Sequence, residues 1–230
     1  MMPKPELTPA IVHRDLHQHA EATYRSFNLK LLPTVDPDCL LGVRVPQVRA
    51  LAKGYLRAYD CEPYIARPAH RYFEEQLLHG CIIGQTKDPE VAQAHIQAYL
   101  PHLDNWATCD SFAPVAISRQ ADFFYPHLLE WLSNPHEYTV RFALVMLMKH
   151  YLKGPLQPGL LSTIAELKRP EYYVRMGQAW FWAEALTHQW DEAVAHIPQL
   201  EEWVRRKAIQ KARESWRIPD ERKAHLRQYR

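Results

Sequence analysis

The stretch YYVRMGQAWFWAEAL, residues 172–186, decides the fold because its pattern occurs three times in the second half of the chain. EYTVRFALVMLMKHYL (137–152) precedes it, and EWVRRKAIQKARES (202–215) follows it. Each copy begins at an aromatic residue, continues with Val-Arg and then presents a mostly apolar or small helical face. Such self-similarity is typical of repeat proteins, in which each unit buries its apolar face only against its neighbours.

The matching arginines of the three copies are Arg141, Arg175 and Arg205, which are 34 and 30 residues apart. Periods of this size predict a single-domain α-solenoid of HEAT-like repeats over residues 1–230, curved and with a concave, basic face. The arginines have two interpretations. They could bond helix ends or acidic neighbours within the repeats, or they could point into the concavity toward a polyanion. For Arg175 and Arg205 both interpretations stay open.

The composition predicts an all-α fold. The 230 residues include only 7 glycines, no Asn-Gly or Asp-Gly hairpin signal and no strand-like alternation. The 18 prolines fall mostly where helices should start or stop, as Pro46, Pro89, Pro135, Pro158, Pro170 and Pro219 do. We expect roughly a dozen helices of about 10 to 18 residues with short connections.

Several classes of protein are excluded. No apolar run approaches the roughly 20 residues that cross a bilayer, and the N-terminus lacks the apolar core of a secretory signal. The cysteines are scattered without a C-x-x-C pair, which favours reduced, packed thiols rather than disulfides or a zinc site. We therefore expect a cytoplasmic protein without membrane contact. These cysteines are Cys39, Cys61, Cys81 and Cys109.

The C-terminal segment is basic. Residues 201–230 carry ten Lys or Arg against five Asp or Glu, although the formal net charge of the chain is only +2. This distribution suits phosphate contacts and suits a solvated terminal helix equally well. Lys207, Lys211 and Arg213 fit a helix that grips a nucleic-acid backbone. Arg44 and Arg49 flank a proline at a helix start, where they could contact phosphate or be solvated.

The segment LDNWATCDSF (103–112) places Trp106 and Asp110 four residues apart, on one face of a helix that begins near Asp104 or Asn105. In isolation this pattern favours a packed ring and a solvated carboxylate, because such short patterns recur by chance.

A functional role needs partners, and two occur at equivalent positions of later repeats, Arg141 and Trp180. Trp182 points about 200° away from Trp180 and should pack between helix layers.

Taken together, these segments resemble the AlkD-like DNA alkylation repair family, whose members are HEAT-repeat DNA glycosylases that remove alkylated purines. The resemblance runs through LLGVRVPQVRALAK, NWATCDSF, YTVRFALV, YYVRMGQAWFWAEAL and AIQKARESWRI. The family forms its catalytic cleft from a Trp-x-x-x-Asp pair, an arginine of the next repeat and a tryptophan of the repeat after. In this sequence the matching positions are Trp106, Asp110, Arg141 and Trp180.

The resemblance implies a monofunctional glycosylase acting on double-stranded DNA with cationic alkylated bases such as 7-methylguanine or 3-methyladenine. Asp110 would stabilise an oxocarbenium-like sugar and position water. Trp106 and Trp180 would offer π faces to the cation, and Arg141 would pair with a phosphate. The family implies that the lesion stays stacked rather than flipped out. We expect a monomer that uses no metal or cofactor.

Two alternatives belong to other classes. The chain could be a non-catalytic HEAT-like protein that binds damaged or branched DNA, or a protein–protein scaffold, which is a common use of HEAT solenoids. The carboxylate of Asp110 favours the enzyme over the first, and the tryptophan, arginine and lysine residues argue against the second. His13, His17 and His19 complete no recognisable metal motif, and exposed helix histidines are the favoured interpretation.

Overall fold

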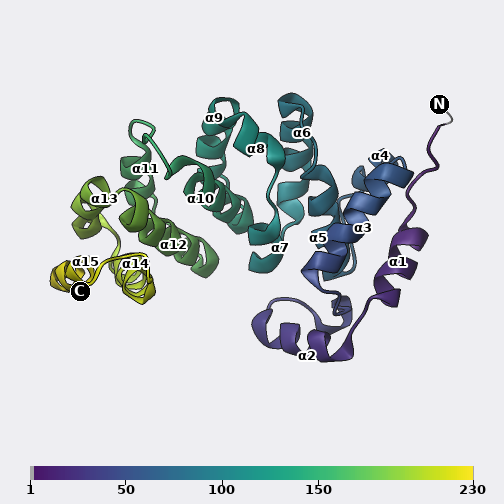
Figure 1. Ribbon diagram of the computed structural model, residues 1–230, viewed down its shortest axis with the longest axis horizontal. Helices are drawn as coiled ribbons and strands as arrows, with labels where there is room; N and C mark the ends of the chain where they lie inside the picture. The colour runs from purple at the N-terminus through teal and green to yellow at the C-terminus, as the bar shows by residue number, and fades with distance from the viewer. Residues whose placement is uncertain (1–2, 230) are drawn as a thin grey trace. The chain divides into compact units, whose positions relative to one another are not determined.

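The chain folds into helices joined mostly by short connections, as Figure 1 shows for the computed structural model, which describes residues 3–229. No strand occurs among these residues, and the bridge between Glu6 and Asp60 is isolated. The all-α prediction is therefore confirmed. Backbone contacts separate two compact units, one ending at Gln120 and the other beginning at Ala121. The single domain over residues 1–230, its curvature and its concave face stay predictions.

The first unit is organised around one buried helix, α5, which contacts α3, α4, α6 and α7. Residues 73–80 of α5 are all buried, which explains why this helix shows no clear polar face. The helices of this unit are α1 (Pro9–Gln18), α2 (Ala22–Leu31), η1 (Pro37–Cys39), α3 (Val45–Ala58), α4 (Glu62–Ile65), α5 (Phe73–Ile83), α6 (Pro89–Tyr99), η2 (Leu100–His102), α7 (Trp106–Ser111) and α8 (Val115–Arg119).

A buried carboxylate holds the loop that leads into α3. Glu74 is 0% exposed, and its two oxygens accept hydrogen bonds from the backbone N–H groups of Leu41, Gly42 and Val43 at 3.0, 2.7 and 3.1 Å. Gly42 has a φ of 92°, and a Cβ there would lie 2.6 Å from the carbonyl oxygen of Glu21. Only glycine fits this position, so the Leu-Gly of the LLGVRVP segment has a structural cause.

The second unit contains the three copies of the repeated pattern as three helices that pack in chain order. α10 contacts α12, and α12 contacts α14, as Figure 1 shows. The predicted helical repeat is confirmed in this arrangement. The helices are α9 (Ala121–Leu132), α10 (Glu137–Tyr151), α11 (Leu160–Glu166), α12 (Tyr172–His188), α13 (Trp190–His196), η3 (Ile197–Gln199), α14 (Glu202–Glu214), α15 (Asp220–His225) and η4 (Leu226–Tyr229).

Helix starts follow the proline signals, but several helices are shorter than expected. Pro89 is the first residue of α6, where the side chain of Asp88 accepts a hydrogen bond from Val91 N at 3.0 Å. Pro219 directly precedes α15. The helices α4, α7, α8, α11, α13 and α15 have 4 to 7 residues, below the expected range of about 10 to 18. Packing against longer neighbours stabilises such short helices.

We expect Glu74→Gln to lower the free energy of unfolding by about 1–3 kcal/mol, because the amide nitrogen of glutamine cannot accept a backbone hydrogen bond. Urea unfolding measures the change. Glu62→Gln is the matched control, since the Glu62 side chain is 71% exposed. Equal stability of the two variants would contradict the role given to the buried carboxylate.

Candidate functional site

The helix that carries Trp106 and Asp110 begins at a buried asparagine. Asn105 is 1% exposed, and its Oδ1 accepts a hydrogen bond from Thr108 N at 2.8 Å. Its Nδ2 donates to Gln76 Oε1 at 3.2 Å and to Asp104 Oδ1 at 2.8 Å. The predicted cap is confirmed, and Asn105 rather than Asp104 provides it. Because Gln76 belongs to α5, the start of α7 is fixed on the central helix of the unit.

A buried tyrosine holds the other end of α7. Tyr99 is fully buried, and its hydroxyl donates to the carbonyl oxygen of Gln76 at 2.6 Å. Its ring packs edge-on against Phe112, the C-terminal cap residue of α7, at a centroid distance of 5.1 Å. The same ring stacks on His79 at 4.7 Å. The short helix α7 is therefore held at both ends by side chains that water does not reach.

Trp106 and Asp110 lie one turn apart on α7, and both are half-buried. The Trp106 ring packs partly against the hydrophobic core, and its Nε1 donates to the carbonyl oxygen of Leu31 at 3.2 Å. Trp106 thus combines the packing role with a partly accessible ring. Since the indole N–H is already bonded, the accessible part of the ring is its carbon π surface, which attracts cations.

The two tryptophans of α12 differ as their positions on the helix predict. Trp182 is 0% exposed, which confirms that it packs between helices, whereas Trp180 is half-buried. Trp180 and Lys211 of α14 line one hollow of about 340 Å³. The second unit therefore brings one predicted cleft residue together with one predicted DNA-binding residue.

Arg141 joins two repeat helices. It lies in α10, is 5% exposed, and its Nη1 donates to the carbonyl oxygen of Tyr173 in the first turn of α12 at 2.8 Å. Gly177 of α12 lies beside the Arg141 stem, where a Cβ would be in ordinary van der Waals contact at 3.5 Å from Arg141 Cγ. The structure thus gives Arg141 an anchoring contact, and its contact with phosphate stays a prediction.

The arginine of the second copy makes a similar connection to the next helix. Arg175 Nη2 lies 2.8 Å from Glu201 Oε2, and the Arg175 guanidinium lies over the Trp203 ring at 4.5 Å. Glu201 in turn caps α14. Arg205, in the third copy, donates to the carbonyl oxygen of Leu200 at 3.5 Å. These contacts support the structural interpretation of the arginines, while their binding of DNA stays a prediction.

Of the residues predicted to bind the DNA backbone, Lys207 and Lys211 share one face of α14, whereas Arg213 points about 200° away from Lys211. Lys207 and Lys211 are both half-buried along their stems, and Lys207 Nζ donates to Gln210 Oε1 at 3.2 Å. Arg213 is half-buried in the last turn of the same helix. The two lysines are four residues apart, about 6 Å along the helix axis. That spacing allows both ammonium groups to reach one strand of a duplex.

Arg44 and Arg49 have partners inside the first unit. Arg44 forms a two-pronged ion pair with Glu21, with Nε 2.9 Å from Oε1, and lies 4.7 Å from the centre of the Tyr24 ring. Burial raises the pKa of the Cys81 thiol, and its hydrogen bond with Arg49 partly offsets that rise. The role of both arginines in DNA binding stays a prediction.

The predicted site residues thus form one pair in each unit: Trp106 with Asp110, and Trp180 with Lys211.

The model of one protein family, described as DNA alkylation repair enzyme, matches residues 12–214. This match covers most of the 230 residues.

The chain belongs to the DNA alkylation repair enzyme family. Membership supports a role in DNA repair, an enzymatic activity and DNA as the partner. A comparison with curated protein sequences found no match. Of the residues that the structure describes, none belongs to a helix long and apolar enough to cross a membrane.

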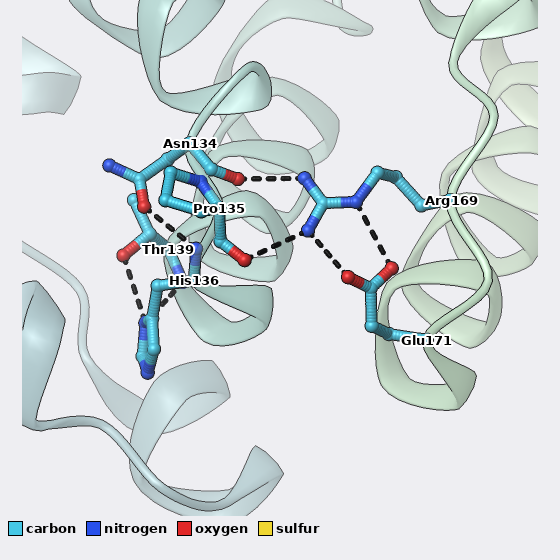
Figure 2. Close-up of polar contacts among 6 residues, drawn as sticks. All are labelled: Asn134, Pro135, His136, Thr139, Arg169 and Glu171. Carbon is cyan, nitrogen blue, oxygen red and sulfur yellow. Dashed lines mark hydrogen bonds and ion pairs between the residues drawn. The ribbon is translucent and has the colours of Figure 1, made fainter.

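In this member of the DNA alkylation repair enzyme family, sequence reasoning missed Arg169. Figure 2 shows its guanidinium between two helix starts. Nη1 donates to the carbonyl oxygen of Asn134 at 2.7 Å, and Nη2 donates to that of Pro135 at 3.0 Å. The same group pairs with both oxygens of Glu171, the N-cap residue of α12. In the sequence, the signal for this contact is the proline-led start that the two helices share, NPHEY at 134–138 and RPEYY at 169–173.

The candidate metal ligands have other partners. His13 Nε2 lies 2.7 Å from Glu75 Oε1, and His13 and His17 pack edge-on against Tyr72. Within residues 3–229, no group of three or more His, Cys, Asp or Glu side chains could hold a metal ion. The four cysteines are free thiols, and Cys61 and Cys109 are buried.

A buried histidine pair lies beside the support of α7. His70 Nε2 and His79 Nδ1 are 2.8 Å apart, so one ring donates to the other. Burial, together with the smaller effect of the neighbouring His70, lowers the pKa of His79 to about 3. Burial also lowers the pKa of His70 to about 4, against an opposing effect of Glu75. Both rings are therefore neutral at neutral pH.

We expect the free energy of unfolding to fall as the pH decreases from about 6.5 toward 4. In this range the histidines of the unfolded chain bind protons, whereas His70 and His79 of the folded protein stay neutral. The loss should approach about 1.4 kcal/mol per pH unit for each histidine. Thermal unfolding between pH 7.5 and 5 measures it. His79→Phe, which keeps a ring on Tyr99, should flatten the dependence, and parallel curves for the two proteins would contradict this origin.

Proposed function

We propose that this protein is a DNA glycosylase that hydrolyses the N-glycosidic bond of cationic alkylated purines, such as 7-methylguanine and 3-methyladenine. The observation that supports this most directly is the Trp106–Asp110 pair. An aromatic π surface and a carboxylate, both half-buried, lie one turn apart on a helix that is fixed at both ends. A cationic ligand is the species that both groups attract.

The reaction needs little from the protein beyond electrostatics. Alkylation at N7 of guanine or N3 of adenine places a positive charge on the base and weakens the bond to the sugar. That bond breaks, its electrons leave with the base, and the base departs neutral. The positive charge then resides on an oxocarbenium-like sugar, which the Asp110 carboxylate would stabilise. The same carboxylate would orient the water that adds to the sugar and would help to remove its proton.

The remaining predicted residues would hold the nucleotide. Trp106 and Trp180 would contact the cationic nucleotide through their rings. Arg141 would contact a phosphate through its guanidinium. Their convergence on one cleft, with the lesion still stacked in the duplex, is part of the proposal. Lys207, Lys211 and Arg213 would bind the DNA backbone.

We expect Asp110→Asn to slow base release by at least about 100-fold, because the neutral amide cannot stabilise the sugar cation. The measurement is release of free base from duplex DNA containing 7-methylguanine under single-turnover conditions. Asp122→Asn, an exposed carboxylate of α9, is the matched control and should retain wild-type activity. If Asp110→Asn released base at the wild-type rate, the mechanism would be wrong.

Binding measurements separate the enzyme from the alternative. Asp110→Asn should still bind the duplex with the wild-type salt dependence, because the phosphate contacts remain when base release is lost. If wild type binds damaged DNA but releases no base, the non-catalytic DNA-binding function takes the place of the glycosylase.

We expect Arg141→Gln to change both stability and binding. Loss of the bond to Tyr173 should lower the free energy of unfolding by about 1–3 kcal/mol, because the carbonyl oxygen loses its buried donor. If Arg141 contacts a phosphate, the slope of log affinity against log salt should decrease by about one in magnitude. Fluorescence anisotropy below the unfolding transition measures the slope, and an unchanged slope would remove Arg141 from the DNA interface.

A further inference from the structure

Trp216 is the most exposed large hydrophobic side chain in the described part of the chain. It is 89% exposed, compared with 56% for Tyr172 and 55% for Phe27. A tryptophan offers a large apolar surface, and leaving it in water forgoes the free energy that burial would give. A single exposed apolar residue is nevertheless ordinary on a protein surface. Its surroundings therefore decide whether it has a role.

The backbone around Trp216 is anchored on both sides. Arg217, the next residue, pairs with both carboxylate oxygens of Glu184 in α12, with Nη1 2.9 Å from Oε2. The backbone N–H of Arg217 donates to Ser215 Oγ at 3.2 Å, and Ile218 is only 2% exposed. The segment is fixed to the helices, while the Trp216 side chain is 89% exposed.

The ring projects beside a predicted site residue. Trp180, Lys211 and Trp216 line the same hollow of about 340 Å³. The two glutamates of the hollow have partners: Glu184 is paired with Arg217, and Glu214 accepts a hydrogen bond from Gln210 Nε2 at 3.0 Å. Besides the two aromatic rings, the hollow thus contains the ammonium group of Lys211, the ion pair of Arg217 with Glu184, and the carboxylate of Glu214.

The accessible side of α14 extends this character. Lys207 lies one turn before Lys211 on the same face of the helix, whereas Arg213 points about 200° away from Lys211. Two lysines beside exposed aromatic rings are complementary to a DNA backbone, whose phosphates carry negative charge and whose sugars offer apolar contact.

We propose that Trp216 contacts the DNA, with its ring against a nucleotide that flanks the lesion. The proposal rests on the proposed function, which places the lesion itself at Trp180. Because Trp216 shares the Trp180 hollow, its ring would meet the neighbouring nucleotide of the same duplex. Contact between an aromatic ring and the sugar of a nucleotide is tolerant of sequence, since every nucleotide carries the same sugar.

The physical nature of the contact distinguishes it from that of the lysines. A lysine that neutralises a phosphate releases a bound counterion, so its removal decreases the salt dependence of binding. An aromatic ring displaces no counterion. Loss of the Trp216 ring should therefore weaken binding to the same extent at every salt concentration.

The experiment measures the affinity for a duplex containing 7-methylguanine by fluorescence anisotropy at several salt concentrations. Trp216→Ala should weaken binding by about tenfold, through lost burial of apolar ring surface, with an unchanged salt slope. Trp216→Phe should recover most of the affinity. Lys211→Ala should decrease the slope by about 0.9 in magnitude. Val91→Ala, an exposed apolar residue of α6 that is 46% exposed, is the control and should bind like wild type.

The outcomes separate this proposal from the proposed function. Trp216→Ala should unfold at the wild-type urea concentration because its ring is exposed, so weaker binding would reflect a lost contact. Wild-type affinity in Trp216→Ala, or a slope changed as in Lys211→Ala, would overturn the proposal. If wild type released no base but Trp216→Ala still bound DNA more weakly, the glycosylase would fail and the Trp216 contact would stand. If wild type did not bind the duplex, both would be wrong.

Discussion

Arginine guanidinium groups connect the N-terminal ends of α10, α12 and α14 through hydrogen bonds and ion pairs. Arg169 connects the backbone before α10 with the cap of α12, Arg141 connects α10 with the first turn of α12, and Arg175 connects α12 with the cap of α14. A guanidinium is planar and carries five donors, so one side chain can satisfy several acceptors at a helix boundary. The apolar faces pack the helices together, and these bonds set the register in which they pack.

Fixed register matters for the candidate site because its residues are distributed over several short segments. Trp180 lies on α12 and Lys211 on α14, so their common hollow exists only while the two helices keep their offset. In the first unit the same requirement is met differently. The six-residue α7 is too short to be stable alone, and Asn105 and Tyr99 hold its two ends against α5 and its neighbours. Both arrangements place partly exposed aromatic rings on rigid supports.

Local signals in the sequence predicted much of the fold and the burial of individual residues in the candidate site. Helical periodicity predicted the all-α fold, the repeated Val-Arg pattern predicted the helices α10, α12 and α14, and angular spacing distinguished buried Trp182 from accessible Trp180. Glu74 and Arg169 could not be found in this way. Their backbone partners lie more than 30 residues away, and a charged residue in a sequence gives no sign that a distant backbone segment will surround it. The relation between Trp106–Asp110 and Trp180 depends on such long-range geometry as well.

The hydrogen bond from Trp106 to Leu31 limits what the proposed site can recognise. The indole N–H is the group with which a tryptophan could tell one base edge from another, and here a backbone carbonyl inside the protein accepts it. The rest of the ring responds to shape and charge. Under the proposed function, such a ring would accept either purine, would prefer a damaged nucleotide because it is cationic, and would lose its attraction when the base departs neutral. Selectivity for damage and ease of product release would then have the same origin.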